Sequence, residues 1–432
     1  MFPNDVVELA NKFIDLQDKI FQLNSKNIDA HKTFFDELDP KFISHYLPQI
    51  AHYFYFASII RQKNISLYVD LFNYLISQGN EDNDLSNLSN YYLDYIFTPP
   101  PSKTDVTIKI GPISFLRMLY EESVYTIETI IDRIEQFYKQ YPKHGNSFLL
   151  YFCWFIPEIE QNRQELYSKT ISMFDSTQLL MFPYYFVNFF RQLEDLRADE
   201  WKLFHFLTIN HYHPSSISYA IANDDAISLQ IKISHIPDLD DVRIDCTVFE
   251  TEFILQNRPT LLQFSIAHNS EKCTKLLMLN HAHFEEHMYE RYPTSHFAVA
   301  SENELILHKL EQEKSNFNGS LNIAAFYHRS DVFEWLSTTL FQNLKKDDFD
   351  CGPLIHSCIP TENYSVIIRC IEKGVYINQR DRTKKTFLFE AARSNHQDIV
   401  ELILSHPDVN INLHAISFDF KSNLKKKKLF FK

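Results

Sequence analysis

One interval, about 33 residues long, recurs along the second half of the chain. It separates apolar residues of the same type in the pairs Phe264 and Phe297, Ala267 and Ala300, and Leu277 and Leu310. The same interval, or one position more, leads from Leu321 to Leu354 and from Leu354 to Leu388. A unit of this length holds one pair of short helices, and a single pair cannot hide its apolar faces alone. The interval therefore predicts an all-α fold in which an α-solenoid of stacked helix pairs spans residues 214–413.

The last unit of this series has the most complete motif. Thr386, Leu388, Ala391 and Ala392 mark its expected first helix, and the second helix is expected near residues 398–404. The two alanines are small, so the second helix can approach the first closely. Leu388 is then expected to lie in the core between neighbouring units.

This unit resembles an ankyrin repeat, whose pattern contains Thr-Pro-Leu-His followed by two alanines. It departs from that pattern at Lys384, Phe387 and Phe389, where the family has Gly, Pro and His. The preceding unit, residues 352–378, keeps the family's Pro-Leu-x-His at residues 353–356. The resemblance implies an ankyrin-type solenoid, in which lost turn residues weaken single turns without changing the register.

The resemblance also implies a function, because ankyrin arrays bind protein partners through their connector tips and the first helix of each unit. In the last unit the corresponding residues are Arg380, Arg382, Lys384, Lys385, Phe389 and Arg393. If they bind, their positive charge favours an acidic partner. The alternative for Lys384 and Lys385 is that they are ordinary solvated charges at a connector tip.

Two upstream units are more divergent. Residues 214–234 and 260–310 resemble an ankyrin-related domain of unknown function that occurs in large protein families of some parasitic protists. Residues 13–20 are also similar to those proteins. This resemblance implies no activity.

The region before the repeats is expected to be helical. Val6, Leu9, Phe13, Leu16, Ile20 and Leu23 are spaced by three or four residues, as on one face of a helix. The helix is expected to pack on its own domain, or alternatively to form a coiled coil through which a structural protein assembles with itself. The expected domains are an N-terminal helical domain at 1–80, a linker at 81–110, a helical region at 111–213 that could hold degenerate repeats, and a basic tail at 414–432.

Composition excludes several function classes. The chain has only 6 glycines, too few for dinucleotide- or phosphate-binding loops, and this scarcity favours helices joined by polar turns. A net charge of −14 argues against a nucleic-acid partner. The 6 cysteines form no CxxC pair and indicate a reducing compartment, so a cytoplasmic protein is expected. The lysine-rich tail leaves a nuclear location open, and no membrane span, cofactor or bound metal is expected.

Two histidine clusters have a chemical alternative. His283, Glu286 and His287 fit the spacing of an inverted zinc-hydrolase motif. They fall in a connector between two units, however, so a plain polar connector is favoured over a metal site and the chain is not expected to be an enzyme. His205, His211 and His213 precede Pro214 and are expected to end a helix, where charged imidazolium suits the negative end of the helix dipole.

Overall fold

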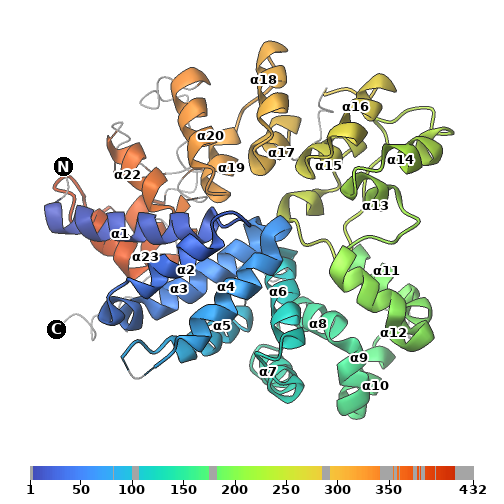
Figure 1. Ribbon diagram of the computed structural model, residues 1–432, viewed down its shortest axis with the longest axis horizontal. Coiled ribbons are helices and arrows are strands. Elements are labelled where there is room, and N and C mark those ends of the chain that lie inside the picture. Colours follow the sequence, from blue (N-terminus) through green and yellow to red (C-terminus); the bar gives the residue numbers. More distant parts are fainter. Residues whose placement is uncertain are drawn as a thin grey trace. The chain divides into compact units, whose positions relative to one another are not determined.

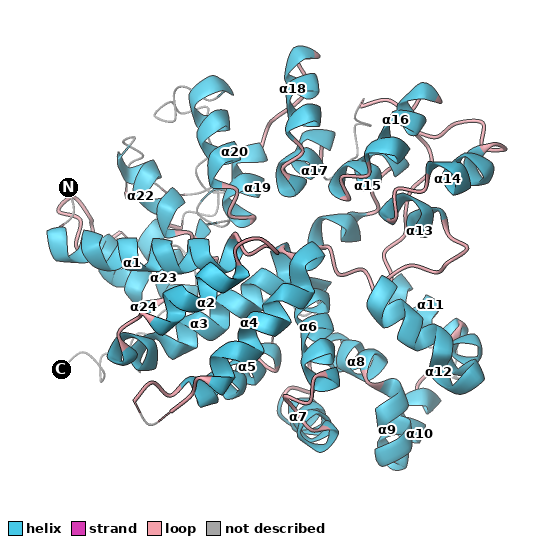
Figure 2. Cartoon of the chain, in the orientation of Figure 1, coloured by secondary structure: helices cyan, strands magenta, loops and turns pink. Residues whose placement is uncertain are grey.

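The chain has 432 residues, and its computed structural model describes residues 3–80, 82–99, 107–174, 182–284, 292–340, 354, 358–359, 361–372, 377–378, 380, 385–394 and 396–413. Throughout these residues the secondary structure is helical, with loops between the helices (Figure 2). The described residues form no strand, and one isolated bridge joins Arg243 to Thr260. The prediction of an all-α fold is confirmed.

The chain divides into two compact units. Unit 1 consists of residues 1–16 and 316–432, and unit 2 consists of residues 17–315. Helix α1 (Asn4–Phe21) contributes its first part to unit 1 and its last part to unit 2.

Unit 2 contains most of the helices (Figure 1). Its first group comprises α2 (Ile28–Asp36), α3 (Pro40–Ile60), η1 (Gln62–Asn64), α4 (Ile65–Ser77), η2 (Leu85–Asn87) and α5 (Leu88–Ile96). The second comprises η3 (Thr107–Lys109), α6 (Ile110–Glu121), α7 (Ile127–Gln140), α8 (Gly145–Trp154), α9 (Ile156–Asn162), α10 (Gln164–Ser172), α11 (Tyr184–Arg191) and α12 (Leu193–Asn210). The third comprises α13 (Ile217–Ala222), α14 (Ala226–Ile233), η5 (Phe253–Asn257), α15 (Leu261–Ala267), α16 (Glu271–Leu279), α17 (Thr294–Ser301) and α18 (Glu304–Gln312).

Unit 1 contains the last of the described helices. They are α19 (Ser320–Phe326), α20 (Ser330–Trp335), η6 (Leu336–Leu340), α22 (Tyr364–Glu372), α23 (Phe387–Ser394) and α24 (Gln397–Leu404). None of the described helices is both long and apolar enough to cross a membrane.

Aromatic rings fill the core of the first group of helices. Phe72 lies edge-on to Phe54 and Tyr92, with ring centroids 5.1 and 5.5 Å apart, and Tyr92 lies edge-on to Phe115 at 5.2 Å. Edge-to-face packing is the preferred geometry of such rings. Helix α6 can come close to α3 because of Gly111, where an added Cβ would overlap the carbonyl oxygen of Ser58.

Helix α5 lies within the segment 81–110 that the sequence analysis treats as a linker. Its residues Leu88, Tyr92, Leu93 and Ile96 are buried, and the helix packs mainly on α3. These residues are spaced by one, three or four positions, which places them on one helical face. The polar residues before Leu88 hid this short apolar stripe.

Gly79 follows helix α4 without the left-handed conformation with which glycine often ends a helix. Helix α4 ends at Ser77, and Gly79 does not have a positive φ. A Cβ at this position would overlap the backbone nitrogen of Ser86. The glycine is therefore required by a close backbone approach and not by its φ angle.

Six helix pairs in the predicted repeat region share one turn, and this turn defines the repeats. In each pair a backbone N–H donates to the carbonyl oxygen five positions earlier, over 2.8–3.2 Å. The accepting residues are all small: Ala220, Ser265, Ala298, Ala324, Cys358 and Ala391. The residue before each donor has a positive φ wherever it is described, at Asp224, Asn269, Glu302, His328 and Glu362. Polar residues thus take the turn position that glycine usually fills, as the scarcity of glycine predicts.

The positions of the six accepting residues refine the predicted register. The regular interval separates Ser265 from Ala298 and Cys358 from Ala391, whereas the step from Ala298 to Ala324 is shorter. Leu321 lies three positions before the acceptor Ala324. The residue three positions before the next acceptor, Cys358, is residue 355. The predicted pairing of Leu321 with Leu354 is therefore wrong by one position. The longest step leads from Ala220 to Ser265 and reflects a longer connector between α14 and α15.

That connector forms part of the core of unit 2. Val248, Phe249, Ile254 and Leu255 are each at most 4% exposed, although they lie outside any α-helix. Trp154 of α8 donates its indole N–H to the carbonyl oxygen of Val248 at 2.9 Å. The insertion therefore joins the helices of region 111–213 to the repeats that follow.

Ring contacts strengthen the same junction. The Phe249 ring packs against Trp154, Phe189 and Phe204, with ring centroids 5.6 to 5.9 Å apart. These partners come from α8, α11 and α12. One side chain of the connector thus contacts three helices that precede it in the chain.

Region 111–213 contains one turn of the same kind as the repeats. Between α6 and α7 the backbone N–H of Val124 donates to the carbonyl oxygen of Leu119 at 2.9 Å, and Ser123 before it has a positive φ. The acceptor is large, unlike the six acceptors above. It resembles Leu277 and Leu310, which accept the same kind of bond from Ala282 and Ser315 after helices α16 and α18. Whether this region is made of degenerate repeats stays a prediction.

The N-terminal stripe forms the helix α1 that the sequence predicts. Phe13, Leu16 and Ile20 are at most 1% exposed. Within unit 1, the Phe13 ring stacks on that of Tyr364 in α22, with centroids 5.0 Å apart and planes 10° from parallel. The stripe is thus buried inside the chain, as the first alternative expects, and the beginning of the chain packs on one of the last repeats.

The core position expected for Leu388 is only half-buried. Leu262 and Leu321 occupy the equivalent place, three positions before the turn acceptor, and each is 1% exposed. Leu388 is of intermediate exposure, whereas its neighbour Phe387 is 1% exposed. Leu388 lies in the last repeat that the described residues contain.

Two matched truncations test this register. We expect Leu262→Ala to lower the free energy of unfolding by about 2–5 kcal/mol, because it opens a cavity in a closed core. The same truncation at Leu388 removes a half-covered side chain, so we expect it to cost clearly less. Urea unfolding followed by circular dichroism measures both, and an equal loss at the two positions would show that the register is wrong.

Candidate functional site

The binding residues expected in the last repeat lie before and on helix α23. Arg380 and Arg393 are exposed, and Phe389 is half-buried. Arg382 and Lys384 lie outside the described residues. The described members of the set therefore come from the connector and the first helix, the two places that the ankyrin pattern assigns to partner contacts.

A buried carboxylate organises two of these cations. Glu390 is 0% exposed, and its side chain is ion-paired with Lys385 at 3.0 Å and with Arg393 at 2.7 Å. A carboxylate taken out of water is costly unless charges of the opposite sign compensate it. Thr386 adds a helix cap, because its side chain accepts a hydrogen bond from the backbone N–H of Phe389 at 3.2 Å. The start of α23 is thus fixed by the Thr386 cap and by the ion pairs of Glu390 with Lys385 and Arg393.

Glu390 is a residue that sequence reasoning missed. It stands in the apolar run Phe387 to Ala392, where a charged side chain is unusual. Lys385 precedes it by five positions and Arg393 follows it by three. That combination of an acid within an apolar run and flanking cations was the available signal.

A second buried polar contact joins two described repeats of unit 1. Glu362 is 4% exposed, and its Oε1 lies 2.5 Å from Nδ1 of His396. The neighbouring Asn363 donates its side-chain amide to the carbonyl oxygen of Ala325 in the preceding repeat, at 2.8 Å. Each polar side chain at these turns therefore reaches an adjacent repeat, which fixes the spacing of the repeats.

The inverted zinc motif lies only partly within the described residues, which include His283. His283 donates its backbone N–H to Asp240 at 2.9 Å, and its ring Nδ1 lies 2.8 Å from the same carboxylate. Glu286 and His287 lie outside the described residues. Among the residues that are described, no three His, Cys, Asp or Glu side chains gather as metal ligands would.

One histidine before Pro214, His211, lies at a helix end as predicted, but its ring is not charged. Helix α12 ends at Asn210, and His211 follows it with a φ of 65°. Burial lowers the pKa of His211 to about 4, so its ring is neutral at pH 7. His213 contacts the Ser215 hydroxyl at 2.7 Å, and His205 lies within α12. The expected imidazolium at the helix dipole is therefore wrong for His211.

A chain of titratable groups lies inside unit 2. The Tyr212 hydroxyl is 2.9 Å from Oε2 of Glu250 and 3.1 Å from Nε2 of His268. Burial raises the pKa of Glu250 to about 8 and lowers the pKa of His268 to about 3. At pH 7 all three groups are thus neutral, because burial disfavours the charged form of each. This neutral chain ties the connector to α15 and carries no charge with which to bind an ion.

The raised pKa of Glu250 predicts how stability depends on pH. Between about pH 4.5 and 8 the folded protein holds a proton that the unfolded chain has lost, so the free energy of unfolding falls as pH rises. The variant Glu250→Gln has no carboxyl group at this position, so its free energy of unfolding does not fall for this reason. We therefore expect the variant to gain stability relative to the native chain as pH rises toward 8.

The comparison is cleanest between about pH 7.5 and 8.5, because His268 is largely neutral there in both the folded and the unfolded state. Urea unfolding midpoints at several pH values across this window measure the effect. Glu37→Gln removes an exposed carboxylate and serves as the control. Parallel curves for the native chain and Glu250→Gln would contradict the assignment of a protonated Glu250.

The comparisons with known proteins agree with the repeat geometry. No curated protein matches the chain. Residues 321–415 match the model of a protein family described as ankyrin repeats (3 copies). This range contains the last three of the six shared turns, at Ala324, Cys358 and Ala391. Residues 321–415 are therefore ankyrin repeats.

Proposed function

We propose that the chain is a non-catalytic protein-binding module, or scaffold, whose ankyrin repeats bind a protein partner. The observation that carries the proposal is the ankyrin match at residues 321–415, since ankyrin repeats form an interaction fold. Stacked repeats hold a constant buried framework and leave connector tips and exposed helix faces able to vary. Function in such a protein resides on that variable surface.

The charge of the last connector indicates the kind of partner. Residues 380–385 contain four cations and one acid, in a chain whose net charge is −14. A local basic surface on an acidic protein favours an acidic partner and speeds its approach. The proposed surface comprises Arg380, Arg382, Lys384, Lys385, Phe389 and Arg393.

The members of this surface differ in their structural role. Lys385 and Arg393 compensate the buried charge of Glu390, so replacing either of them would also disturb the fold. Arg380 is exposed, and Arg382 and Lys384 share its connector. A test of binding should therefore change Arg380, Arg382 and Lys384 and leave the Glu390 network intact.

Disulfides do not occur among the described residues, where Cys153, Cys246, Cys273, Cys358 and Cys370 are reduced thiols. Four of the five are buried. Reduced thiols fit a reducing compartment, and we place the binding function in the cytoplasm. A nuclear location is the alternative, because of the lysines in residues 414–432.

Charge reversal tests the proposed surface. We expect the full-length protein carrying Arg380→Glu, Arg382→Glu and Lys384→Glu to lose the partner that the native protein retains on an affinity column. The physical reason is that three attractive charges become repulsive toward an acidic surface. Quantitative mass spectrometry of the retained proteins measures the loss, and circular dichroism verifies that the variant is folded.

A matched variant controls for the change in net charge. Lys26, Lys41 and Lys143 are exposed and lie far from the repeats in sequence, so their triple change to Glu shifts the net charge equally. We expect this control to retain the partner. Equal retention by both variants would move the binding surface away from the last repeat, and the absence of any specific partner would contradict the binding function.

A further inference from the structure

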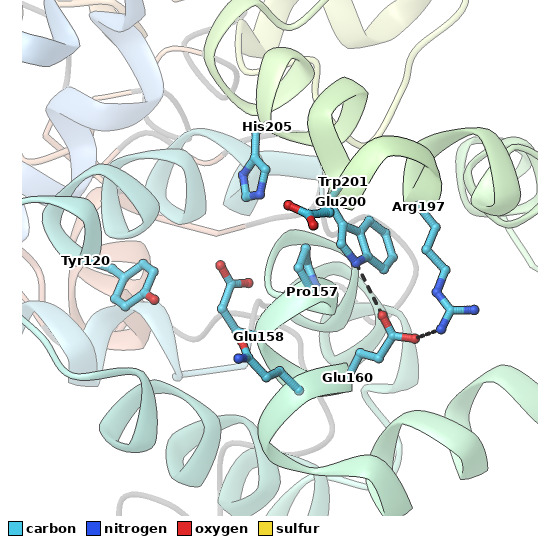
Figure 3. A pocket seen from close by; sticks show the side chains of 9 residues that line it. Tyr120, Pro157, Glu158, Glu160, Arg197, Glu200, Trp201 and His205 are labelled. Carbon is cyan, nitrogen blue, oxygen red and sulfur yellow. Dashed lines mark hydrogen bonds and ion pairs between the residues drawn. The ribbon is translucent and has the colours of Figure 1, made fainter.

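A pocket of about 660 Å³ lies in unit 2, outside the repeats (Figure 3). It is formed between the end of α6, the short helix α9 and the middle of α12. A volume of this size is in the range of pockets that bind small ligands or single side chains. Nothing in the ankyrin surface or in the proposed function uses this pocket.

Carboxylates dominate the lining of the pocket. Glu158, Glu160 and Glu200 line it together with the aromatic side chains of Tyr120 and Trp201. In Figure 3 the carboxylate of Glu158 points up into the space between Tyr120 and His205, and that of Glu200 lies across from it. Several negative charges thus line one half-open pocket next to aromatic rings.

The two arginines near the pocket are already neutralised. Arg197 is ion-paired with Glu160 at 2.5 Å, and the same carboxylate accepts the indole N–H of Trp201 at 3.2 Å. Buried Arg117 lies 2.7 Å from Glu158 and 3.1 Å from Glu121. Two guanidinium groups therefore face four carboxylates, and the pocket keeps an excess of negative charge.

One oxygen of the pocket is left without a hydrogen bond. Glu158 is 9% exposed; its Oε1 is bound to Arg117, but its Oε2 has no partner among the described residues. A buried carboxylate oxygen without a donor is energetically costly. Oε2 can therefore accept a further donor, and no described side chain supplies one.

The backbone of α12 brings two more of these groups to the pocket. Asp199, Glu200 and Trp201 all have positive φ angles, between 50° and 64°. L-residues rarely adopt this conformation in succession, because each one places its Cβ too close to the following carbonyl oxygen. The break turns the helix at the residues that supply the Glu200 carboxylate and the Trp201 ring.

We propose that this pocket binds a cationic alkyl group, an ammonium or guanidinium, as carried by lysine or arginine side chains and by free amines. The cation would supply the missing donor to Glu158, would be attracted by Glu200, and would lie near the rings of Tyr120 and Trp201. Aromatic rings attract cations most strongly where water is excluded. The pocket is separate from the ankyrin surface, so an experiment can refute one of the two binding proposals without affecting the other.

Small probes test the proposal on the full-length protein. The cationic probes are Nα-acetyl-lysine N-methylamide and Nα-acetyl-arginine N-methylamide, and the neutral control is Nα-acetyl-norleucine N-methylamide, which has a similar shape. We expect the cationic probes to bind and the neutral one not to bind in ligand-observed NMR titrations. Cadaverine carries the ammonium without a peptide backbone: equal binding of cadaverine identifies free amines as the source, and weaker binding identifies a polypeptide side chain.

Two variants connect binding to the carboxylates. Glu158→Gln should weaken the cationic probes about tenfold, because a charged hydrogen bond is replaced by a neutral one. Since Glu158 also holds Arg117, circular dichroism must show that this variant folds. Glu200→Gln is the second variant: Glu200 is exposed and forms no hydrogen bond or ion pair with the described residues, so its replacement should weaken binding without affecting the fold.

The control is Glu165→Gln, which removes an exposed carboxylate of α10 outside the pocket. It should bind the probes as the native protein does. The proposal is overturned if norleucine amide binds as tightly as lysine amide, or if Glu200→Gln binds as the native protein does. It is equally overturned if no cationic probe binds at concentrations up to about 10 mM, where even a weak site of millimolar affinity is largely filled.

Discussion

A single backbone hydrogen bond, repeated in six helix pairs, is the constraint on which the second half of this chain depends. Each bond closes the turn between two short helices and is accepted by a small residue such as Ala298 or Ala391. The bond requires a left-handed residue just before its donor, and this position is held by polar residues such as Asn269 and Glu362. A short helix pair cannot bury its own apolar faces. Each pair is therefore stable only when neighbouring pairs stack on it.

The repeat interval changes where a segment also packs against parts of the chain outside the repeats. The long step between Ala220 and Ser265 contains the connector whose Phe249 packs against three preceding helices. The last repeat leaves Leu388 half-buried, and Phe13 of the first helix stacks on Tyr364 near the other end of the chain. Stacking alone therefore does not complete the fold, which also uses segments from outside the repeats.

Much of the fold could be predicted from the sequence, because helical spacing and the recurring repeat interval are patterns that the chain displays directly. Helix α5 was missed because a polar stretch precedes its four apolar residues, and the buried connector was missed because it follows no period at all. The surroundings of the buried acids are even harder to predict from the sequence. Glu250 is neutral because burial removes its carboxyl group from water, and Glu390 is ion-paired because Lys385 and Arg393 reach it. Such burial depends on partners brought together by folding, so no local pattern reveals it.

Amide hydrogen exchange on the full-length protein tests the central claim, that one turn defines six repeats, most directly. The account predicts slow exchange at the six donor amides, those of Asp225, Ser270, Asn303, Arg329, Asn363 and His396, because each is held in a closed turn. Slow exchange at all six would extend the ankyrin-type turn beyond residues 321–415 to the whole series. Fast, loop-like exchange at Asp225, Ser270 and Asn303 would contradict the account and confine the repeats to the matched range.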